Sequence, residues 1–149
     1  MNEELVKKYN EVVSKDDIVY FLGDVAFSKK DNVKEFISQL NGKKFLVKGN
    51  HDSRSNEFYV EVGFAWVYDR PVIIKDFIIL SHMPVQFLNT NSPFYNIFGH
   101  VHDSQMYPTW TQTSCCACVE RHDYKPVSYD EVMEKYKTLN NVEDEDEQV

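Results

Sequence analysis

The sequence predicts a mixed α/β domain in which helices cover sheets of short strands, and three observations carry this prediction. Segments with helical periodicity alternate with short apolar runs that are bounded by turn residues. The chain has 149 residues, a length that suits one domain with a sizeable core. Its hydrophobic content of 42% and aromatic content of 14% are typical of globular proteins.

The first half predicts a helix followed by a strand–helix–strand unit. The helix is expected over 3–14, where apolar side chains recur on one face. The run IVYFL at 18–22 predicts a buried strand, and a second helix is expected over 31–40, with Asp31 as its cap. The run FLV at 45–47 predicts the next strand. This succession favours a parallel crossover.

The second half predicts antiparallel strands and a last helix. The short runs FAWVYD, PVIIK and FIILSH are separated by turn residues in a hairpin-like pattern. Further strands are expected at YNIF and within TQTSCCACVE. Ser128 and Glu131 form a capping box, which predicts a helix from Ser128 to about Lys137.

The charge pattern limits the classes of partner that the chain is expected to bind. The segment 143–149 holds five of the acids behind the net charge of −8, and it predicts a disordered tail after a domain over 1–142. The nearly neutral remainder predicts no extended nucleic-acid surface. No run has transmembrane length and the N-terminus lacks a signal peptide, so we expect a cytoplasmic protein without a membrane partner.

Three cysteines cluster at Cys115, Cys116 and Cys118. Their odd number makes a disulfide framework unexpected in such a protein. A structural zinc domain that combines them with histidines lacks the second cysteine pair. Their alternation with Ala and Val favours a buried strand.

Four apolar runs stop at Gly or Ser and then present metal-competent side chains. The runs are FLGD at 21–24, FLVKGNHD at 45–52, FIILSH at 77–82 and IFGHVHD at 97–103. Because ligands gather at the carboxyl ends of strands in α/β sheets, we expect these side chains to meet in one place. Residues i and i+2 share a side of a strand, so both histidines of HVH are expected to face this site.

One carboxylate, one amide oxygen and several imidazoles, with no thiolate, favour Mn, Fe, Zn, Ni or Co over Ca or Mg. A carboxylate such as Asp24 can bridge two ions that clamp a phosphoryl group. His51 lies between Asn50 and Asp52. An imidazole held by a carboxylate beside a metal suits proton donation to a leaving group.

In order along the chain, GD at 23–24, GNHD at 49–52, His82 and GHVH at 99–102 resemble the motifs of the calcineurin-like metallophosphoesterase family. The resemblance extends from Ile18 to the segment YKPVSYDEV, and the chain is similar to small single-domain members found in bacteria and their phages. The resemblance implies a layered α/β/β/α sandwich with mixed sheets.

The resemblance also implies a ligand set. Asp24 would bridge two divalent metals, Asn50, His82 and His100 would complete one of them, and His102 would bind the other.

For catalysis, the resemblance implies that His51 contacts the phosphoryl group and assists the leaving group, with Asp52 orienting it. Arg54 would touch the substrate phosphate, or lie on the surface.

The family pattern begins with an Asp-x-His motif on a first strand, and no histidine precedes His51 in this chain. We therefore expect the first strand to be missing, one metal to be held tightly, and the second site to be weak or incomplete. An unpaired sheet edge would favour a homo-oligomer.

Together these features predict metal-dependent hydrolysis of phosphomonoesters or phosphodiesters, with a small phosphoester or nucleotide as substrate, in a bacterial or phage-infected cytoplasm. The alternative is a catalytically impaired metal-binding member that holds a phosphate ligand or a partner protein.

Overall fold

The computed structural model describes residues 2–25, 29–86, 88–89 and 91–142, so the expected acidic tail lies outside the described residues. The helices and strands follow one another as α1 (Asn2–Val12), β1 (Ile18–Phe21), α2 (Lys30–Ser38), β2 (Lys43–Val47), α3 (Asn56–Val62), β3 (Trp66–Tyr68), β4 (Val72–Ile74), β5 (Ile78–Ser81), β6 (Tyr95–Phe98), β7 (Ser114–Cys116), the 3-10 turn η1 (Val119–Arg121) and α4 (Tyr129–Asn140). This confirms the mixed α/β class.

The strands form two sheets. The first has the order β1-β2-β3 and is parallel, with β1 at one edge. The second has the order β4-β5-β6-β7, in which only the β4–β5 pair is antiparallel. The expected parallel crossover from β1 through α2 to β2 is confirmed.

The antiparallel prediction was right for β4 and β5 and wrong for β3, which pairs parallel to β2. The reason is helix α3, which the sequence analysis missed and which supplies the crossover between β2 and β3. Ser55 caps this helix, since its side chain accepts a hydrogen bond from the backbone N–H of Phe58.

Two further predictions concern helix ends. Asp31 lies inside the first turn of α2 and is not its cap, because the helix begins one residue earlier than expected. Ser128 does cap α4, with its side chain 3.1 Å from the N–H of Glu131. Helix α4 runs to Asn140, beyond the expected end, and stops where Asn141 adopts a left-handed conformation.

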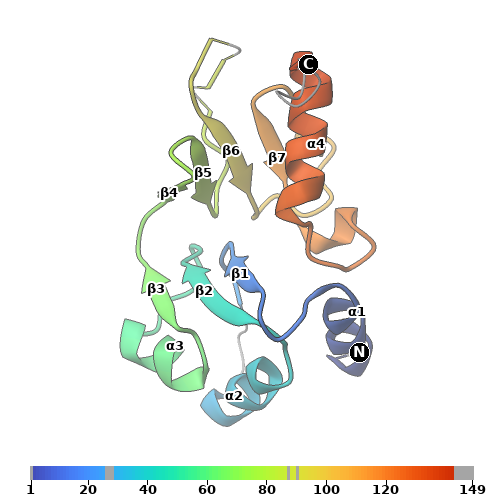
Figure 1. The fold of residues 1–149 in the computed structure, drawn as a ribbon. Helices are drawn as coiled ribbons and strands as arrows, with labels where there is room; N and C mark the ends of the chain where they lie inside the picture. The colour runs from blue at the N-terminus through green and yellow to red at the C-terminus, as the bar shows by residue number, and fades with distance from the viewer. Residues whose placement is uncertain (1, 26–28, 87, 90, 143–149) are drawn as a thin grey trace.

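The core has two main parts that share the first sheet. Helices α1, α2 and α3 pack on one face of this sheet, around buried side chains such as Ile37, Leu46 and Phe64. On its other face, Val47 packs with Tyr95 of the second sheet and with Val132 of α4 (Figure 1). The sheets are therefore joined by apolar contacts, which is the layered arrangement that the sequence predicts.

The strand directions locate a single meeting point. In Figure 1, β1 and β2 run toward the second sheet, while β5 and β6 run toward the first. The carboxyl ends of four strands thus converge between the sheets, and the loops that follow them come from both halves of the domain.

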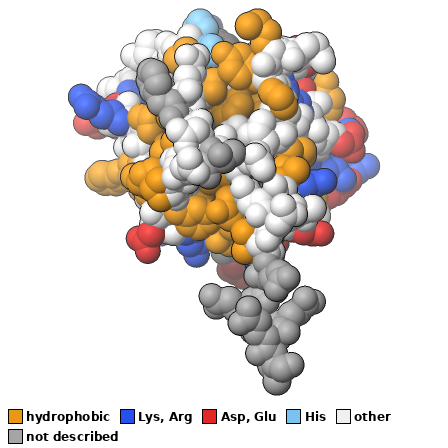
Figure 2. Space-filling model, turned by 90° about the horizontal axis from the view of Figure 1, so that it is seen from above, with side chains coloured by type: hydrophobic (Ala, Val, Ile, Leu, Met, Phe, Trp, Pro, Cys, Tyr) orange, Lys and Arg blue, Asp and Glu red, His pale blue; other side chains and the backbone are white. Residues whose placement is uncertain are grey.

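None of the helices in the described part of the chain has the length and hydrophobicity needed to cross a membrane. Figure 2 shows that uncharged and apolar side chains fill the middle of one face of the molecule, whereas the charged side chains visible there lie mostly near its edges.

Replacing Leu46 by alanine tests the core around the first sheet. Leu46 is fully buried in β2, so we expect Leu46→Ala to lower the free energy of unfolding by about 2–5 kcal/mol, measured by urea denaturation. Leu139→Ala, at a 37% exposed position, should cost less than about 1 kcal/mol. Equal losses in the two variants would contradict this packing.

Candidate metal centre

The loops after β1 and β2 touch at two glycines. Gly23 has φ +92°, a conformation that suits glycine. A Cβ on Gly49 would lie 2.7 Å from the backbone nitrogen of Asp24 and 2.9 Å from the ring of His82. Because real side chains do not approach so closely, glycine at both positions is what allows the two loops to meet.

The carboxylate of Asp52 ties these loops together. Its Oδ2 accepts hydrogen bonds of 2.7 Å from the backbone N–H groups of both Asp24 and Gly49, and its Oδ1 accepts one of 3.1 Å from Val25. The side chain is buried, so these charge-assisted bonds are shielded from water. The described bonds of Asp52 thus hold the backbone on both sides of the site.

Asp24 faces two partners with its two oxygens. Its Oδ1 accepts a 3.0 Å hydrogen bond from the backbone N–H of His51, and its Oδ2 lies 3.2 Å from Nε2 of His82. Its backbone is left-handed, with φ 54°, which costs about 1 kcal/mol for a residue with a side chain. The bonds from Asp52 hold it in this conformation.

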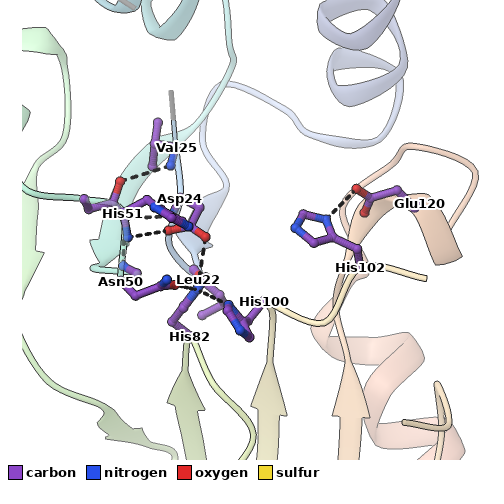
Figure 3. A network of polar contacts seen from close by, with 11 residues as sticks. Leu22, Asp24, Val25, Asn50, His51, His82, His100, His102 and Glu120 are labelled. Carbon is purple, nitrogen blue, oxygen red and sulfur yellow. Dashed lines mark hydrogen bonds and ion pairs between the residues drawn. The ribbon is translucent and has the colours of Figure 1, made fainter. Parts of the chain in front are cut away.

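His82 is buried, and a backbone carbonyl determines which of its ring nitrogens carries a proton. Its Nδ1 lies 2.6 Å from the carbonyl oxygen of Leu22, which can only accept, so Nδ1 carries a proton. In the neutral ring Nε2 then presents a lone pair. Within 3.2 Å of this Nε2 lie Oδ1 of Asn50 at 2.8 Å, Nδ1 of His100 at 2.9 Å and the Asp24 oxygen (Figure 3).

Three polar atoms therefore converge on Nε2 of His82, and a single proton shared with one of them would leave the other two contacts unsatisfied. A divalent cation would satisfy all four atoms. With bonds of about 2.0–2.2 Å to nitrogen and oxygen, neighbouring ligand atoms lie about 3 Å apart, and the three contacts of Nε2 of His82 have about this length. The ligand atoms of Asp24, His82 and His100 all lie within 4.8 Å of one another. The residues present fit a divalent transition metal.

The prediction that His100 and His102 share one side of a strand was wrong. Strand β6 ends at Phe98, and both histidines have left-handed backbones, with φ 65° and 48°. The alternation of an extended strand does not apply to such residues. His100 points toward His82, whereas the ring of His102, 65% exposed, lies with its Nδ1 2.9 Å from Oε1 of Glu120 (Figure 3).

Glu120 was not singled out by the sequence, where nothing marks it among neighbouring polar residues. Partial burial of its carboxyl is the largest single effect and opposes ionisation, but the hydrogen bond with His102, a backbone hydrogen bond and the charges of His102 and Arg121 together outweigh it, so the pKa of Glu120 lies below its usual value. The carboxylate therefore accepts from Nδ1 of His102 and leaves the lone pair on Nε2, an arrangement common for metal-binding histidines.

Two other predicted residues, His51 and Arg54, have exposed side chains. His51 is exposed, and its backbone bond to Asp24 places it beside the converging atoms. Arg54 is exposed, with its guanidinium 4.9 Å from the ring centre of Phe58. The structure thus brings His51 to the centre and packs Arg54 on α3.

All three cysteines are free and buried. Cys115 and Cys116 lie in β7, which agrees with the predicted buried strand. Burial raises the pKa of Cys115 to about 12, whereas the hydrogen bond with Cys118 lowers that of Cys116. Among the described residues, no cluster of three or more potential metal ligands includes a thiol. This argues against a structural zinc site made of cysteines and histidines.

Comparisons with known proteins find a matching family model and similar proteins. The model of the calcineurin-like phosphoesterase family matches residues 2–142. An uncharacterized protein of Methanocaldococcus jannaschii is 33% identical over 153 residues, covering 97% of this chain and 81% of the relative. A crystal structure of a protein of unknown function from Aquifex aeolicus aligns with a TM-score of 0.66 and 27% identity, over 89% of this chain and 83% of that one.

Asp52→Asn tests the clamp between the loops. An amide offers one acceptor oxygen in place of two and turns an N–H toward backbone donors, so we expect the free energy of unfolding to fall by about 2–3 kcal/mol. Urea denaturation measures it. Asp103→Asn, at an exposed carboxylate whose side chain lies outside this network, is the matched control and should change stability by less than about 0.5 kcal/mol.

Proposed function

This chain belongs to the calcineurin-like phosphoesterase family, and from this premise we propose that it hydrolyses phosphomonoesters or phosphodiesters in a metal-dependent reaction. The observation that carries the proposal is the convergence of three potential ligand atoms on Nε2 of His82. The fold alone would not suffice, because one fold can serve many functions.

The proposed ligands of the metal are Asp24, Asn50, His82 and His100. Their mixed oxygen and nitrogen donors suit Mn, Fe, Zn or Ni. When bound, such an ion would activate water and offset the negative charge of the phosphoryl group. The hydrogen bond from His82 to the carbonyl of Leu22 would aim Nε2 at the ion and strengthen it as a ligand.

In this proposal His51 acts on the substrate directly. Its backbone is held at Asp24 and its side chain is exposed, and we propose that its ring contacts a phosphoryl group bound at the metal. A protonated imidazole there would stabilise charge on the phosphoryl oxygens and give its proton to the departing oxygen. Asp52 positions this loop through its backbone bonds. Arg54, whose guanidinium lies 4.9 Å from the ring centre of Phe58, would touch the substrate phosphate.

We propose one tightly held ion and a weak second site. His102 lies outside the group formed by Asp24, His82 and His100, and its Nδ1 is taken by Glu120. A second ion shared between Asp24 and His102 would have few protein ligands to offset its charge.

Metal titration of two histidine variants tests the proposed difference in affinity between the tight site and the weak second site. His100→Ala removes a ligand of the tight site, so we expect its affinity for Mn²⁺ to fall about 100-fold in isothermal titration calorimetry, by about 3 kcal/mol. His102→Ala should retain binding of one ion within about threefold, which is less than 1 kcal/mol. A large loss in His102→Ala would place the tight ion elsewhere.

Hydrolysis assays test the reaction itself. With Mn²⁺ added, the chain should cleave a generic aryl phosphomonoester or phosphodiester. His51→Ala should retain the metal and lose about 10²–10⁴-fold in kcat, because it removes a proton donor. Asp24→Asn should lose both metal and activity.

A result of metal binding without hydrolysis would refute the proposed reaction. It would favour an impaired member of the family that holds a phosphate ligand or a protein, which agrees with the position of His102 outside the group formed by Asp24, His82 and His100.

A further inference from the structure

A cavity of about 380 Å³ opens beside His100, between the loop after β5 and the loop after β6. Its lining residues come from these two loops and are Met83, Pro84 and Gln86 on one side and Val101, Ser104 and Tyr107 on the other. A pocket of this size between two strand-end loops is typical of small-molecule sites.

His100 connects the cavity to the candidate metal centre. Its Nδ1 lies 2.9 Å from Nε2 of His82, and the same residue lines the cavity. A phosphoester whose phosphoryl group lies at the metal centre would therefore have the cavity next to one of its oxygens. This step rests on the proposed function.

A buried hydrogen-bond network holds the first wall. Asn96 is fully buried, and its Oδ1 accepts a 2.9 Å bond from the backbone N–H of Val85. Its Nδ2 donates to Oγ of Ser81 at 2.9 Å, and this hydroxyl donates to the carbonyl of Met83 at 2.7 Å. Because every member is satisfied, the network fixes the loop that carries Met83 and Pro84.

One arginine holds the second wall. The guanidinium of Arg121 donates from Nε to the carbonyl of His102 at 2.6 Å, from Nη2 to that of Ser104 at 2.7 Å, and from Nη1 to that of Tyr107. The ring of Tyr107 packs edge-on against Phe98. Hydrogen bonds thus hold the parts of both walls that carry Met83, Pro84, Ser104 and Tyr107, so a ligand would not have to order these parts.

The chemistry of the lining selects the ligand. Among the described residues that line the cavity, none is Lys, Arg, Asp or Glu. A second phosphate or a carboxylate placed there would lose hydration without gaining an opposite charge. An apolar ring would instead contact Met83, Pro84, Val101 and Tyr107, with the side chains of Gln86 and Ser104 available to polar atoms at its edge.

The size sets an upper limit on the ligand. A cavity of roughly 150 Å³ can hold benzene, so about 380 Å³ has room for two fused rings. We infer that this cavity binds the organic group of the phosphoester, and that this group is uncharged and carries one or two rings.

Three phosphonates that cannot be hydrolysed test the inference on the Mn²⁺-loaded full chain by isothermal titration calorimetry. They are methylphosphonate, 1-naphthylmethylphosphonate and 4-carboxybenzylphosphonate. Because the naphthyl group would bury apolar surface, it should bind about tenfold or more tightly than the methyl compound. The carboxylated ring should bind no more tightly than the methyl compound, because its charge has no partner.

Two variants test whether the tighter binding of the naphthyl compound depends on the cavity. Ser104→Phe fills it and should abolish the naphthyl preference, while methylphosphonate affinity stays within about threefold. Met83→Ala, at a 55% exposed position, removes one contact and should lower the preference about threefold. Met106→Ala, at a position that is 84% exposed and outside the lining, is the control and should keep the full preference.

The outcomes separate this inference from the proposed function. Equal affinities for the methyl and naphthyl compounds, or a preference that survives in Ser104→Phe, would overturn the cavity assignment and leave the hydrolase proposal standing. Failure of methylphosphonate itself to bind the Mn²⁺-loaded chain would overturn both.

Discussion

The close approach of the loops after β1 and β2 is the constraint on which the centre depends. Two residues without side chains, Gly23 and Gly49, allow the backbones to touch, and the carboxylate of Asp52 holds them by accepting from both loops. This contact sets Asp24 in its left-handed conformation and turns its carboxylate toward His82. If the loops moved apart by the width of a methyl group, the oxygen and nitrogen atoms would no longer surround one point.

Much of this arrangement could be predicted from the sequence. Helical periodicity located α1, α2 and α4, and the polar residues that end four apolar runs identified Asp24, Asn50, His82 and His100 as neighbours. The short helix α3 was missed because seven residues give too few turns for a clear periodicity, and the direction of β3 followed from that omission.

Other features could not be predicted from residue types. The carbonyl of Leu22, which fixes the proton of His82, belongs to the backbone, and every residue has such a group. The separation of His100 and His102 depends on left-handed backbone conformations that follow the end of β6, and the sequence pattern suggested a continued strand. The partner of His102 is Glu120, which lies in η1 after β7, and no sequence motif around it indicates this role.

The four proposed ligands come in pairs from different sheets: Asp24 and Asn50 follow β1 and β2, while His82 and His100 follow β5 and β6. An ion held by all four would therefore cross-link the two halves of the domain. Ligand present at 100 times its Kd stabilises a folded protein by about 2.7 kcal/mol, a large share of the stability of a small domain. In a metal-starved cell the unfolded fraction would rise and proteases would remove more of the chain, so the supply of the ion would set the abundance of this protein as well as its turnover rate.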